Sequence, residues 1–519
     1  MVDRHLALVL VVVGVRLGAA ADSAAPTPTA GWRAAEVHLI EDGGLLALAV
    51  RHSRLYALQP VEAAVLRLPP PIGVSTAQER LASQFDRATV AAACASLLDR
   101  GLLLPQDAPE AEPLPRGPLT RLELGVAEDC NLRCPYCFVS QGSFGGTRRL
   151  MPWPVAQRAV ELLFAESGPA PLLQIGFYGG EPLLNTAVVR QVITEATARA
   201  EQAGKQVGFD LITNGTRLTA DLVAFLRAHR VAVQVSLDGP AATNDAIRPN
   251  LGGRGSYRQA TAPLRFFAGY PALQARATLT RANPAADDIV EHLLGLDLPS
   301  VVARPVVGAE GDLGLDEAAA RRIVAGYGRL AERCLAAASD AEAARRSAPF
   351  LGYFGKLMEG RPRRVPCQQE AWTVACAADG ALYPCKDMAA KPQYQIGTVW
   401  SGIDWAKAYD DARGKLLCQQ QAPKKAECKT CWARELCQIS CMHVTVEPKG
   451  ADQDEAPQYS GWECWTSLRV IEIALALFQR LRQERPAVFW ALLGGYQGSE
   501  SPAMATLLAH PSCAPPVEA

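Results

Sequence analysis

Hydrophobic and polar positions alternate in blocks along the middle of the chain. Short apolar runs, each a candidate buried strand, are separated by segments in which apolar residues recur with helical spacing. The expected strands are Arg121–Val126, Leu173–Phe177, Val207–Ile212, Val231–Leu237, Ala275–Leu279 and Val301–Val306. The expected helices include Pro154–Glu166, Ala187–Ala203 and Ala220–Ala228. This alternation predicts an α/β fold with a parallel sheet, arranged as a partial (β/α)6 TIM-like barrel.

The segment 32–104 has a different pattern. Two apolar stretches, Val37–Ile40 and Leu45–Val50, flank the turn sequence Asp42-Gly43-Gly44 and predict a hairpin. Three helices and a returning strand are expected after it, over Pro60–Leu68, Thr76–Phe85, Thr89–Leu98 and Leu102–Leu104. This order of elements is typical of a winged-helix-like domain.

Composition divides the rest of the chain. Residues 105–118 carry five prolines, which predict a linker. The other expected divisions are 1–31 for a signal-like or disordered leader, 119–310 for the partial barrel, 311–365 for a helical bridge, 366–466 for a cysteine-rich domain and 467–519 for a C-terminal helix and tail.

The apolar run Leu6–Gly14 resembles part of a secretory signal peptide. It is too short for a transmembrane helix, and no other segment reaches about 18 uninterrupted apolar residues. We interpret the run as non-functional, because the cysteine pattern described below needs a reducing compartment. The sequence therefore predicts a cytoplasmic protein without a membrane span.

Overall composition narrows the class of protein. The 519 residues suggest about three domains, and 49% hydrophobic with 20% charged residues excludes a disordered chain. Lys and Arg total 52 against 53 Asp and Glu, a net charge of −1. Without a basic excess, no nucleic-acid partner is expected.

The candidate chemistry lies in the 15 cysteines. Cys130, Cys134 and Cys137 follow the first barrel strand with the spacing C-x3-C-x2-C. Three thiolates bind three irons of a cubane cluster and leave the fourth iron open to another ligand. Structural zinc usually takes four protein ligands, so the spacing favours an iron–sulfur cluster.

The phrase CNLRCPYC at 130–137 resembles the cysteine motif of the radical S-adenosylmethionine (radical SAM) superfamily, and GGEP at 179–182 resembles a second motif of that family. The resemblance implies a [4Fe-4S] cluster on three cysteines and S-adenosyl-L-methionine on the open iron. Reductive cleavage would give a 5′-deoxyadenosyl radical. The implied cofactor contacts are Tyr136, Gly179, Gly180, Glu181, Pro182, Thr213, Asn214, Ser236, Asp238 and Arg248. For Arg248, a candidate for the methionine carboxylate, a surface salt bridge is the alternative. No catalytic residue is assigned beyond the cluster ligands.

A second set of cysteines resembles the SPASM domain, which holds auxiliary clusters. Its members are Cys367, Cys385, Cys428, Cys431, Cys437, Cys441 and Cys464. The resemblance implies one complete cluster set, formed by Cys428, Cys431, Cys437 and Cys464. The other three would bind a second cluster, whose fourth ligand is open between Cys376, Cys418 and substrate. Zinc is the alternative for any single C-x2-C pair.

The N-terminal unit resembles the precursor-recognition domain of enzymes that modify ribosomally made peptides, which binds a leader peptide by strand addition. The stretch from Cys137 to Met151 resembles maturases that form thioether bonds. The predicted function is a peptide maturase that forms a thioether cross-link, with carbon–carbon and carbon–oxygen bonds left open. The expected partners are a precursor peptide or small protein and an electron donor such as flavodoxin or ferredoxin.

Three alternatives accompany this prediction. A sulfatase maturase would oxidise Ser or Cys to formylglycine, but Lys386 stands where that group commonly has Asp. An amine-dehydrogenase maturation protein is a close relative of the leading prediction. The alternative from a different class is a non-catalytic, metal-binding peptide scaffold, which would not cleave S-adenosylmethionine.

Overall fold

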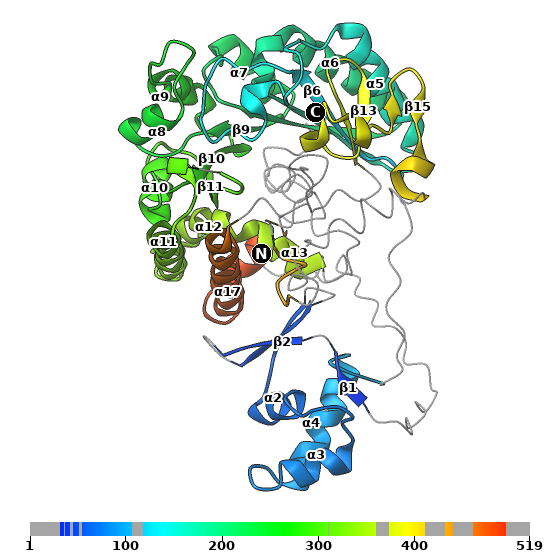
Figure 1. Cartoon of the computed structure of the whole chain (residues 1–519), viewed down its shortest axis with the longest axis vertical. Helices are drawn as coiled ribbons and strands as arrows, with labels where there is room; N and C mark the ends of the chain where they lie inside the picture. The colour runs from blue at the N-terminus through cyan, green and yellow to red at the C-terminus, as the bar shows by residue number, and fades with distance from the viewer. Residues whose placement is uncertain are drawn as a thin grey trace, which may run out of the picture. The chain divides into compact units, whose positions relative to one another are not determined.

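The computed structural model describes residues 32–35, 37–41, 45–50, 54–105, 118–309, 311–359, 373–410, 431–437, 439 and 460–494. The chain forms two compact units (Figure 1). One comprises Met1–Ala35 with Gln59–Glu110, and the other Glu36–Leu58 with Ala111–Ala519. The leader at 1–31, and all but the two ends of the expected linker at 105–118, lie outside the described residues.

Three helices and a strand pair build the first unit. The helices are α2 (Pro60–Leu66), α3 (Val74–Arg80) and α4 (Arg87–Asp99), and β1 (Trp32–Ala34) pairs antiparallel with β5 (Leu103–Pro105). Asp86 caps α4 by accepting a hydrogen bond from the Thr89 N–H. Buried Glu62 of α2 accepts hydrogen bonds from Ser96 (2.9 Å) and from the Arg100 guanidinium, which fasten α2 to α4. The helices match the expectation; β1 was not expected.

The expected hairpin belongs to the second unit. It consists of β2 (Val37–Ile40) and β3 (Leu46–Ala49), and an unexpected third strand, β4 (Arg54–Ala57), pairs antiparallel with β3. All four side chains of β3 are buried, and Leu46 and Leu48 join the main hydrophobic core. The hairpin and the three helices fall in different compact units. The domain boundaries derived from sequence stay a prediction.

The second unit is organised around a ten-stranded sheet of order β11-β10-β9-β8-β7-β6-β12-β13-β14-β15. Six consecutive strands are parallel: β6 (Arg121–Ala127), β7 (Leu172–Gly179), β8 (Gln206–Thr213), β9 (Ala232–Ser236), β10 (Leu273–Leu279) and β11 (Ser300–Pro305). The helices between them are α5 (Trp153–Glu166), α6 (Thr186–Gln202), α7 (Ala220–Ala228), α8 (Ala241–Ile247), α9 (Tyr257–Thr261) and α10 (Ala286–Leu294). All six expected strands are present, and the α/β partial barrel is confirmed.

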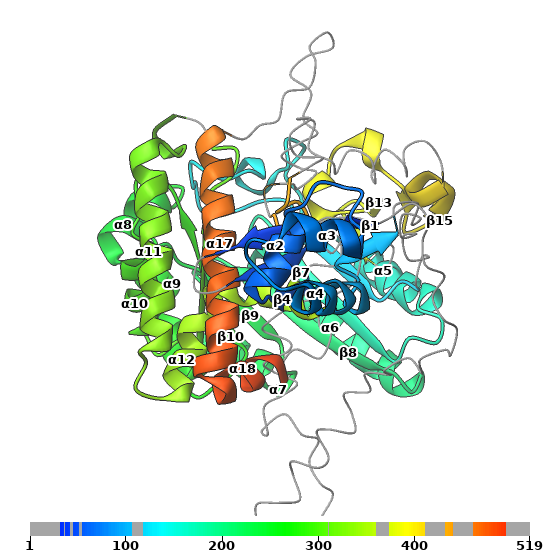
Figure 2. The ribbon, with the colours of Figure 1, turned by 90° about the horizontal axis from the view of Figure 1, so that it is seen from below.

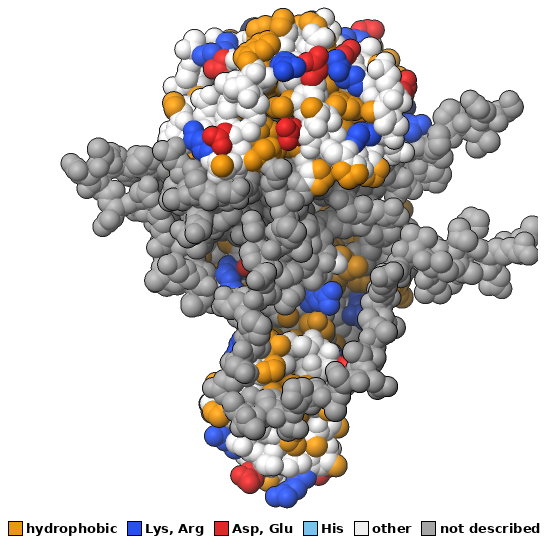
Figure 3. Space-filling view, turned by 90° about the vertical axis from the view of Figure 1, so that its right-hand side faces the viewer, with side chains coloured by type: hydrophobic (Ala, Val, Ile, Leu, Met, Phe, Trp, Pro, Cys, Tyr) orange, Lys and Arg blue, Asp and Glu red, His pale blue; other side chains and the backbone are white. Residues whose placement is uncertain are grey.

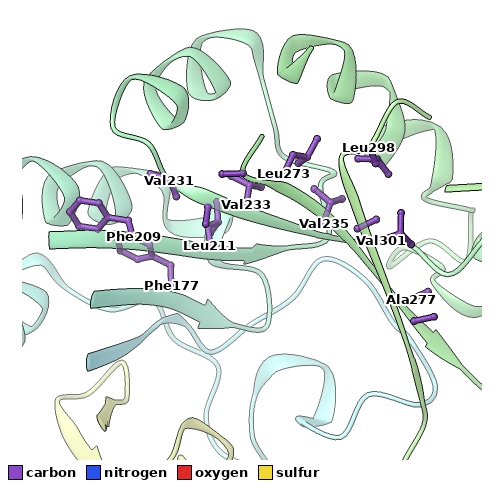
Figure 4. Close-up of a cluster of buried hydrophobic side chains, with 14 of the residues drawn as sticks. Phe177, Phe209, Leu211, Val231, Val233, Val235, Leu273, Ala277, Leu298 and Val301 are labelled. Atoms are coloured by element: carbon purple, nitrogen blue, oxygen red, sulfur yellow. The ribbon is translucent and has the colours of Figure 1, made fainter. Parts of the chain in front are cut away.

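The helices between the strands cover one face of this sheet (Figure 1). Apolar side chains such as Val233, Val235 and Leu273 form a continuous buried layer beneath the helices (Figure 4). On β10, Ala275 and Ala277 are fully buried whereas Arg276 between them is exposed. Because successive side chains of a strand point to opposite faces, Arg276 projects from the inner face of the barrel.

The cysteine-rich segment extends the same sheet, which the sequence did not predict. Strand β12 (Thr373–Cys376) runs parallel to β6, with Cys376 opposite Leu124. Three short antiparallel strands follow it: β13 (Ala381–Tyr383), β14 (Gly397–Thr398) and β15 (Gly402–Ile403). Cys376, one of the two candidates for a fourth cluster ligand, is fully buried on β12.

Helices dominate the described parts of 311–359 and 460–494. They are α11 (Glu317–Leu335), α12 (Asp340–Ser347), α13 (Leu351–Glu359), α17 (Gly461–Glu484) and α18 (Pro486–Gly494). Helices α11 and α17 lie side by side (Figure 2). Ser460 and Glu463 form a capping box at the start of α17, and Glu463 also accepts a hydrogen bond from the Gly308 N–H at 3.0 Å.

The described surface mixes charges of both signs. On the face in Figure 3, Lys and Arg side chains are interspersed with Asp and Glu, as the net charge of −1 leads one to expect. Within the described residues, no helix is both long enough and apolar enough to cross a membrane.

Candidate active site

Three thiols lie on the loop that follows β6. Cys130, Cys134 and Cys137 are half-buried and free of disulfides. Burial raises the pKa of Cys130 to about 12, and the charges of Glu181 and of the other two thiols add to this effect. A raised pKa favours the protonated thiol. Bound iron would reverse this preference, because a metal cation stabilises the thiolate. The donor set therefore suits an iron–sulfur cluster.

Within the described part of the chain, no three cysteine, histidine or acidic side chains converge as ligands of a single metal ion. A four-iron cluster does not require its ligands to converge on one ion, since each thiolate binds a separate iron. The loop itself is fixed by short-range contacts, such as the turn hydrogen bond from the Cys137 N–H to the Cys134 carbonyl at 3.1 Å.

The glycine motif after β7 lies directly against the start of this loop. The Gly180 N–H donates to the Ala127 carbonyl at 2.8 Å, and the Glu181 N–H donates to the Asp129 carbonyl at 2.9 Å. A Cβ atom on Gly180 would come within 2.2 Å of the Asp129 oxygen, and one on Gly179 within 2.2 Å of the Ala127 oxygen. Both positions therefore require glycine for close backbone approach. Pro182 is buried at the start of the 3-10 turn Pro182–Asn185.

Glu181 joins the ends of β7 and β8 from a fully buried position. Its carboxylate accepts hydrogen bonds from the Leu183 N–H (2.9 Å), the Thr213 hydroxyl (2.7 Å) and the Asn214 N–H (2.7 Å). Burial raises the pKa of Glu181, and these hydrogen bonds oppose the shift. Both oxygens thus already bind the protein; contact with a cofactor remains a prediction for this residue.

Sequence reasoning missed two members of an adjacent polar network. Asn131 donates to Thr216 at 2.8 Å, Thr216 donates to Asn214 at 2.6 Å, and Asn214 donates back to Asn131 at 2.9 Å. The Asn214 amide nitrogen also lies 3.8 Å from the Cys130 sulfur. This closed ring connects the cysteine loop to the end of β8. The signal available in the sequence was the position of Asn131 directly after Cys130.

Asp238 binds two other predicted residues, Tyr136 and Arg248. Its buried carboxylate accepts hydrogen bonds from the Tyr136 hydroxyl (2.6 Å), Arg248 (2.7 and 3.2 Å) and the Thr278 N–H (2.8 Å). The Arg248 guanidinium also lies over the Tyr136 ring, 5.5 Å from its centroid. Although burial favours its neutral form, the charge of Asp238 holds the pKa of Arg248 well above its usual value. Ser236 is the last residue of β9 and lies opposite Arg276 of β10.

The C-terminal cysteines are only partly described. Cys367, Cys428 and Cys441, together with Cys418, lie outside the described residues. Cys437 and Cys464 both pack against Ile439, and the Cys437 sulfur lies 3.7 Å from the Ser467 hydroxyl. Cys431 is half-buried beside the main core. Cys385 follows β13 and precedes Lys386, whose ammonium lies 3.9 Å from the Glu123 carboxylate of β6.

Residues 125–267, from β6 to the segment after α9, match the radical SAM superfamily. The chain contains a radical SAM domain. A chain with this domain is an enzyme, and the superfamily uses S-adenosylmethionine and a [4Fe-4S] cluster.

The radical SAM domain and its surroundings resemble several known proteins. An uncharacterized protein of Archaeoglobus fulgidus is 26% identical over 333 residues, which are 61% of this chain and 73% of the relative. A serine-type anaerobic sulfatase-maturating enzyme of Klebsiella aerogenes is 24% identical, covering 64% of this chain and 81% of the relative. The solved structure of native anSMEcpe with bound AdoMet and Cp18Cys peptide superposes with a TM-score of 0.57 at 17% identity, covering 70% of this chain and 98% of that one. This last similarity supports the fold.

Proposed function

We propose that this radical SAM enzyme is a maturase of a ribosomally made peptide and that it forms a thioether cross-link. The observation that carries the proposal is the position of Cys130, Cys134 and Cys137 against the glycine motif, at the carboxyl ends of β6 and β7. In barrel folds, reacting groups lie at this end of the strands.

Different residues around that site would bind the cluster, contact the cofactor and position the strand ends. Cys130, Cys134 and Cys137 would bind the cluster, and Ser236 with the segments around Gly180 and Asn214 would contact S-adenosylmethionine. When bound, this pair supplies a 5′-deoxyadenosyl radical that abstracts hydrogen from carbon. Glu181 and Asn214 hold the ends of β7 and β8 in place through the hydrogen bonds described above. Asp238 orients Tyr136 and Arg248.

The C-terminal cysteines would hold auxiliary clusters. Cys437 and Cys464, packed on the same isoleucine, fit one cluster set together with Cys431 and Cys428. Cys385, Cys367 and Cys441 would bind the other. Such clusters would accept an electron from the product radical or bind the substrate thiolate. Forming a thioether oxidises the peptide by two electrons: the 5′-deoxyadenosyl radical would take a hydrogen atom from carbon, the thiol would release a proton, and an auxiliary cluster would accept the remaining electron. A flavodoxin or ferredoxin class donor would reduce the first cluster.

Peptide recognition would fall to the N-terminal three-stranded sheet of β2, β3 and β4. In the described part of the chain, β2 and β4 are the outer strands of their three-stranded sheet. An extended leader peptide adds to such an edge through main-chain hydrogen bonds. A peptide substrate also agrees with the solved structure of the same fold that holds a peptide.

Formylglycine formation is the second candidate, because a sulfatase-maturating enzyme is among the relatives. Against it stands Lys386, which pairs with Glu123 where that group commonly has an Asp base.

Mass spectrometry separates the two candidates. The reduced, cluster-loaded enzyme is incubated with S-adenosylmethionine and cysteine-containing peptides encoded beside its gene. The proposal expects a peptide that has lost two hydrogen atoms and whose cysteine no longer reacts with iodoacetamide. A product that reacts with hydrazine establishes formylglycine. If no such peptide is altered although 5′-deoxyadenosine forms, the maturase proposal fails.

A further inference from the structure

Two arginines occupy the inner face of the barrel on its last two strands. Arg276 of β10 alternates with fully buried Ala275 and Ala277, and Arg304 of β11 alternates with fully buried Ala303. In the register of these parallel strands, Arg276 lies opposite Val302, and Arg304 lies opposite Thr278. The two arginines are therefore diagonal neighbours on the same face of the sheet.

Neither guanidinium has an acidic partner among the described residues. The Nη1 atom of Arg304 is buried and has no hydrogen-bond partner, and its guanidinium lies over the Tyr353 ring, 5.2 Å from the centroid. The Arg276 side chain is exposed on the inner face of the barrel. Partial loss of hydration there and the charge of Arg304 lower the pKa of its guanidinium. Asp387 acts in the opposite direction on Arg276 without forming an ion pair with it. Arg248 differs, because Asp238 neutralises it.

Two adjacent cations that form no ion pair among the described residues repel each other, and the half-buried Arg304 leaves a guanidinium nitrogen without a hydrogen bond, so the pair favours a bound anion. Guanidinium groups match the planar carboxylate and bind it through paired hydrogen bonds. The sequence-predicted cofactor motifs follow β6, β7, β8 and β9. The arginines lie on β10 and β11, beyond those motifs, and β11 is an edge of the sheet. The position therefore suits a ligand that lies beside the cofactor.

We propose that Arg276 and Arg304 together bind a carboxylate of the peptide substrate, either an acidic side chain near the modified residue or the C-terminus. This inference rests on the proposed function and deepens it, since it makes the substrate an acidic peptide. The methionine carboxylate of S-adenosylmethionine is the other source of the same chemistry, because Arg276 lies opposite Ser236.

A binding experiment on the full-length, cluster-loaded protein tests this assignment. The probe is Nα-acetylglutamate α-amide, which carries one carboxylate, and its matched neutral analogue is Nα-acetylglutamine α-amide. At constant ionic strength, the carboxylate probe raises the melting temperature and the amide does not. Arg276→Met and Arg304→Met each weaken probe binding by about tenfold or more, as loss of a charged hydrogen bond predicts. Arg281→Met, which removes an exposed arginine paired with Asp312, leaves binding unchanged.

The variants report on folding as well. Because Arg276 lies beside the Arg304 charge and forms no described ion pair, Arg276→Met melts without probe at the same or a higher temperature than the unaltered protein. If it does not fold, Arg276→Lys serves instead: it keeps the charge but not the forked geometry, and binds the probe more weakly. Equal probe binding by the unaltered protein and both methionine variants overturns the proposal.

A second arm identifies the source of the carboxylate. With saturating S-adenosylmethionine, the probe still binds if the pair serves the substrate. Loss of probe binding assigns the pair to the cofactor and overturns the peptide assignment. The rate of 5′-deoxyadenosine formation without peptide is measured in the same samples and stays unchanged in both methionine variants. If the unaltered protein forms none, the proposed function fails, while the probe result still decides the anion site.

Discussion

The carboxylate of Asp238 holds the guanidinium of Arg248 with two hydrogen bonds, 2.7 Å to Nε and 3.2 Å to Nη2. The sequence predicts both residues as separate cofactor contacts, with a surface salt bridge as the alternative for Arg248. In the structure they form one buried pair, and the Tyr136 hydroxyl shares the same carboxylate. Asp238 thus positions both side chains, and we expect it to act on a bound cofactor through them.

Replacing Asp238 with Asn tests this arrangement. The change leaves the buried guanidinium of Arg248 without a counter-charge, so we expect a loss of about 3 kcal/mol in the free energy of unfolding. Urea unfolding measures it, and equilibrium dialysis measures the accompanying loss of S-adenosylmethionine binding. The matched control is Asp221→Asn, since Asp221 is 87% exposed and pairs with Arg190 at the surface. It should cost at most about 1 kcal/mol. Equal losses in both variants would contradict the assignment.

Gly180 is the most constrained contact between the glycine motif and the cysteine loop. Gly180→Ala places a Cβ within 2.2 Å of the Asp129 oxygen, so the loop must shift. We expect a loss of about 2 kcal/mol in stability and a lower iron content after reconstitution. Gly328→Ala is the control, because nothing lies within 4 Å of its added Cβ in α11. Iron content that matches between the two variants would show that the close approach is unimportant.

His38 introduces a pH dependence between the N-terminal sheet and the cysteine-rich segment. Its ring stacks on Trp432 with centroids 3.9 Å apart and planes at 6°, and burial lowers its pKa. The unfolded chain therefore takes up the proton first as the pH falls below about 6.5, and stability decreases by at most about 1.4 kcal/mol per pH unit. His38→Phe keeps an aromatic ring but cannot titrate. Urea unfolding at pH 7.5 and 5.5 should show a smaller decrease in this variant; identical decreases would refute the role of His38.

The cysteines of the first cluster and those of the auxiliary clusters should have different roles in catalysis. Cys130→Ala removes a ligand of the first cluster, and we expect formation of 5′-deoxyadenosine to be abolished. Cys437→Ala removes a proposed auxiliary ligand and should retain part of this cleavage while losing peptide modification. Chromatography of the nucleoside product measures both, and circular dichroism controls for folding. A folded Cys437→Ala protein without any cleavage would contradict the separation.

The sequence predicts the strand–helix alternation well, because each parallel strand is a short run rich in buried apolar residues. It misses β12, since four residues near the start of the cysteine-rich segment carry no periodic signal, and pairing with β6 is a long-range contact. Motif spacing finds the residues of the site, yet it does not show which of them bind each other. The hydrogen bonds of Glu181, the ring through Asn131 and the pairing of Asp238 with Arg248 appear only once the strand ends meet in space.

The most direct test of the central claim is anaerobic purification, reduction and addition of S-adenosylmethionine, with 5′-deoxyadenosine and iron measured in the same sample. The account predicts abundant 5′-deoxyadenosine and roughly ten to twelve irons per chain, as three cubane clusters require. Zinc in place of iron, or full iron loading without any 5′-deoxyadenosine in the presence or absence of peptide, would contradict it.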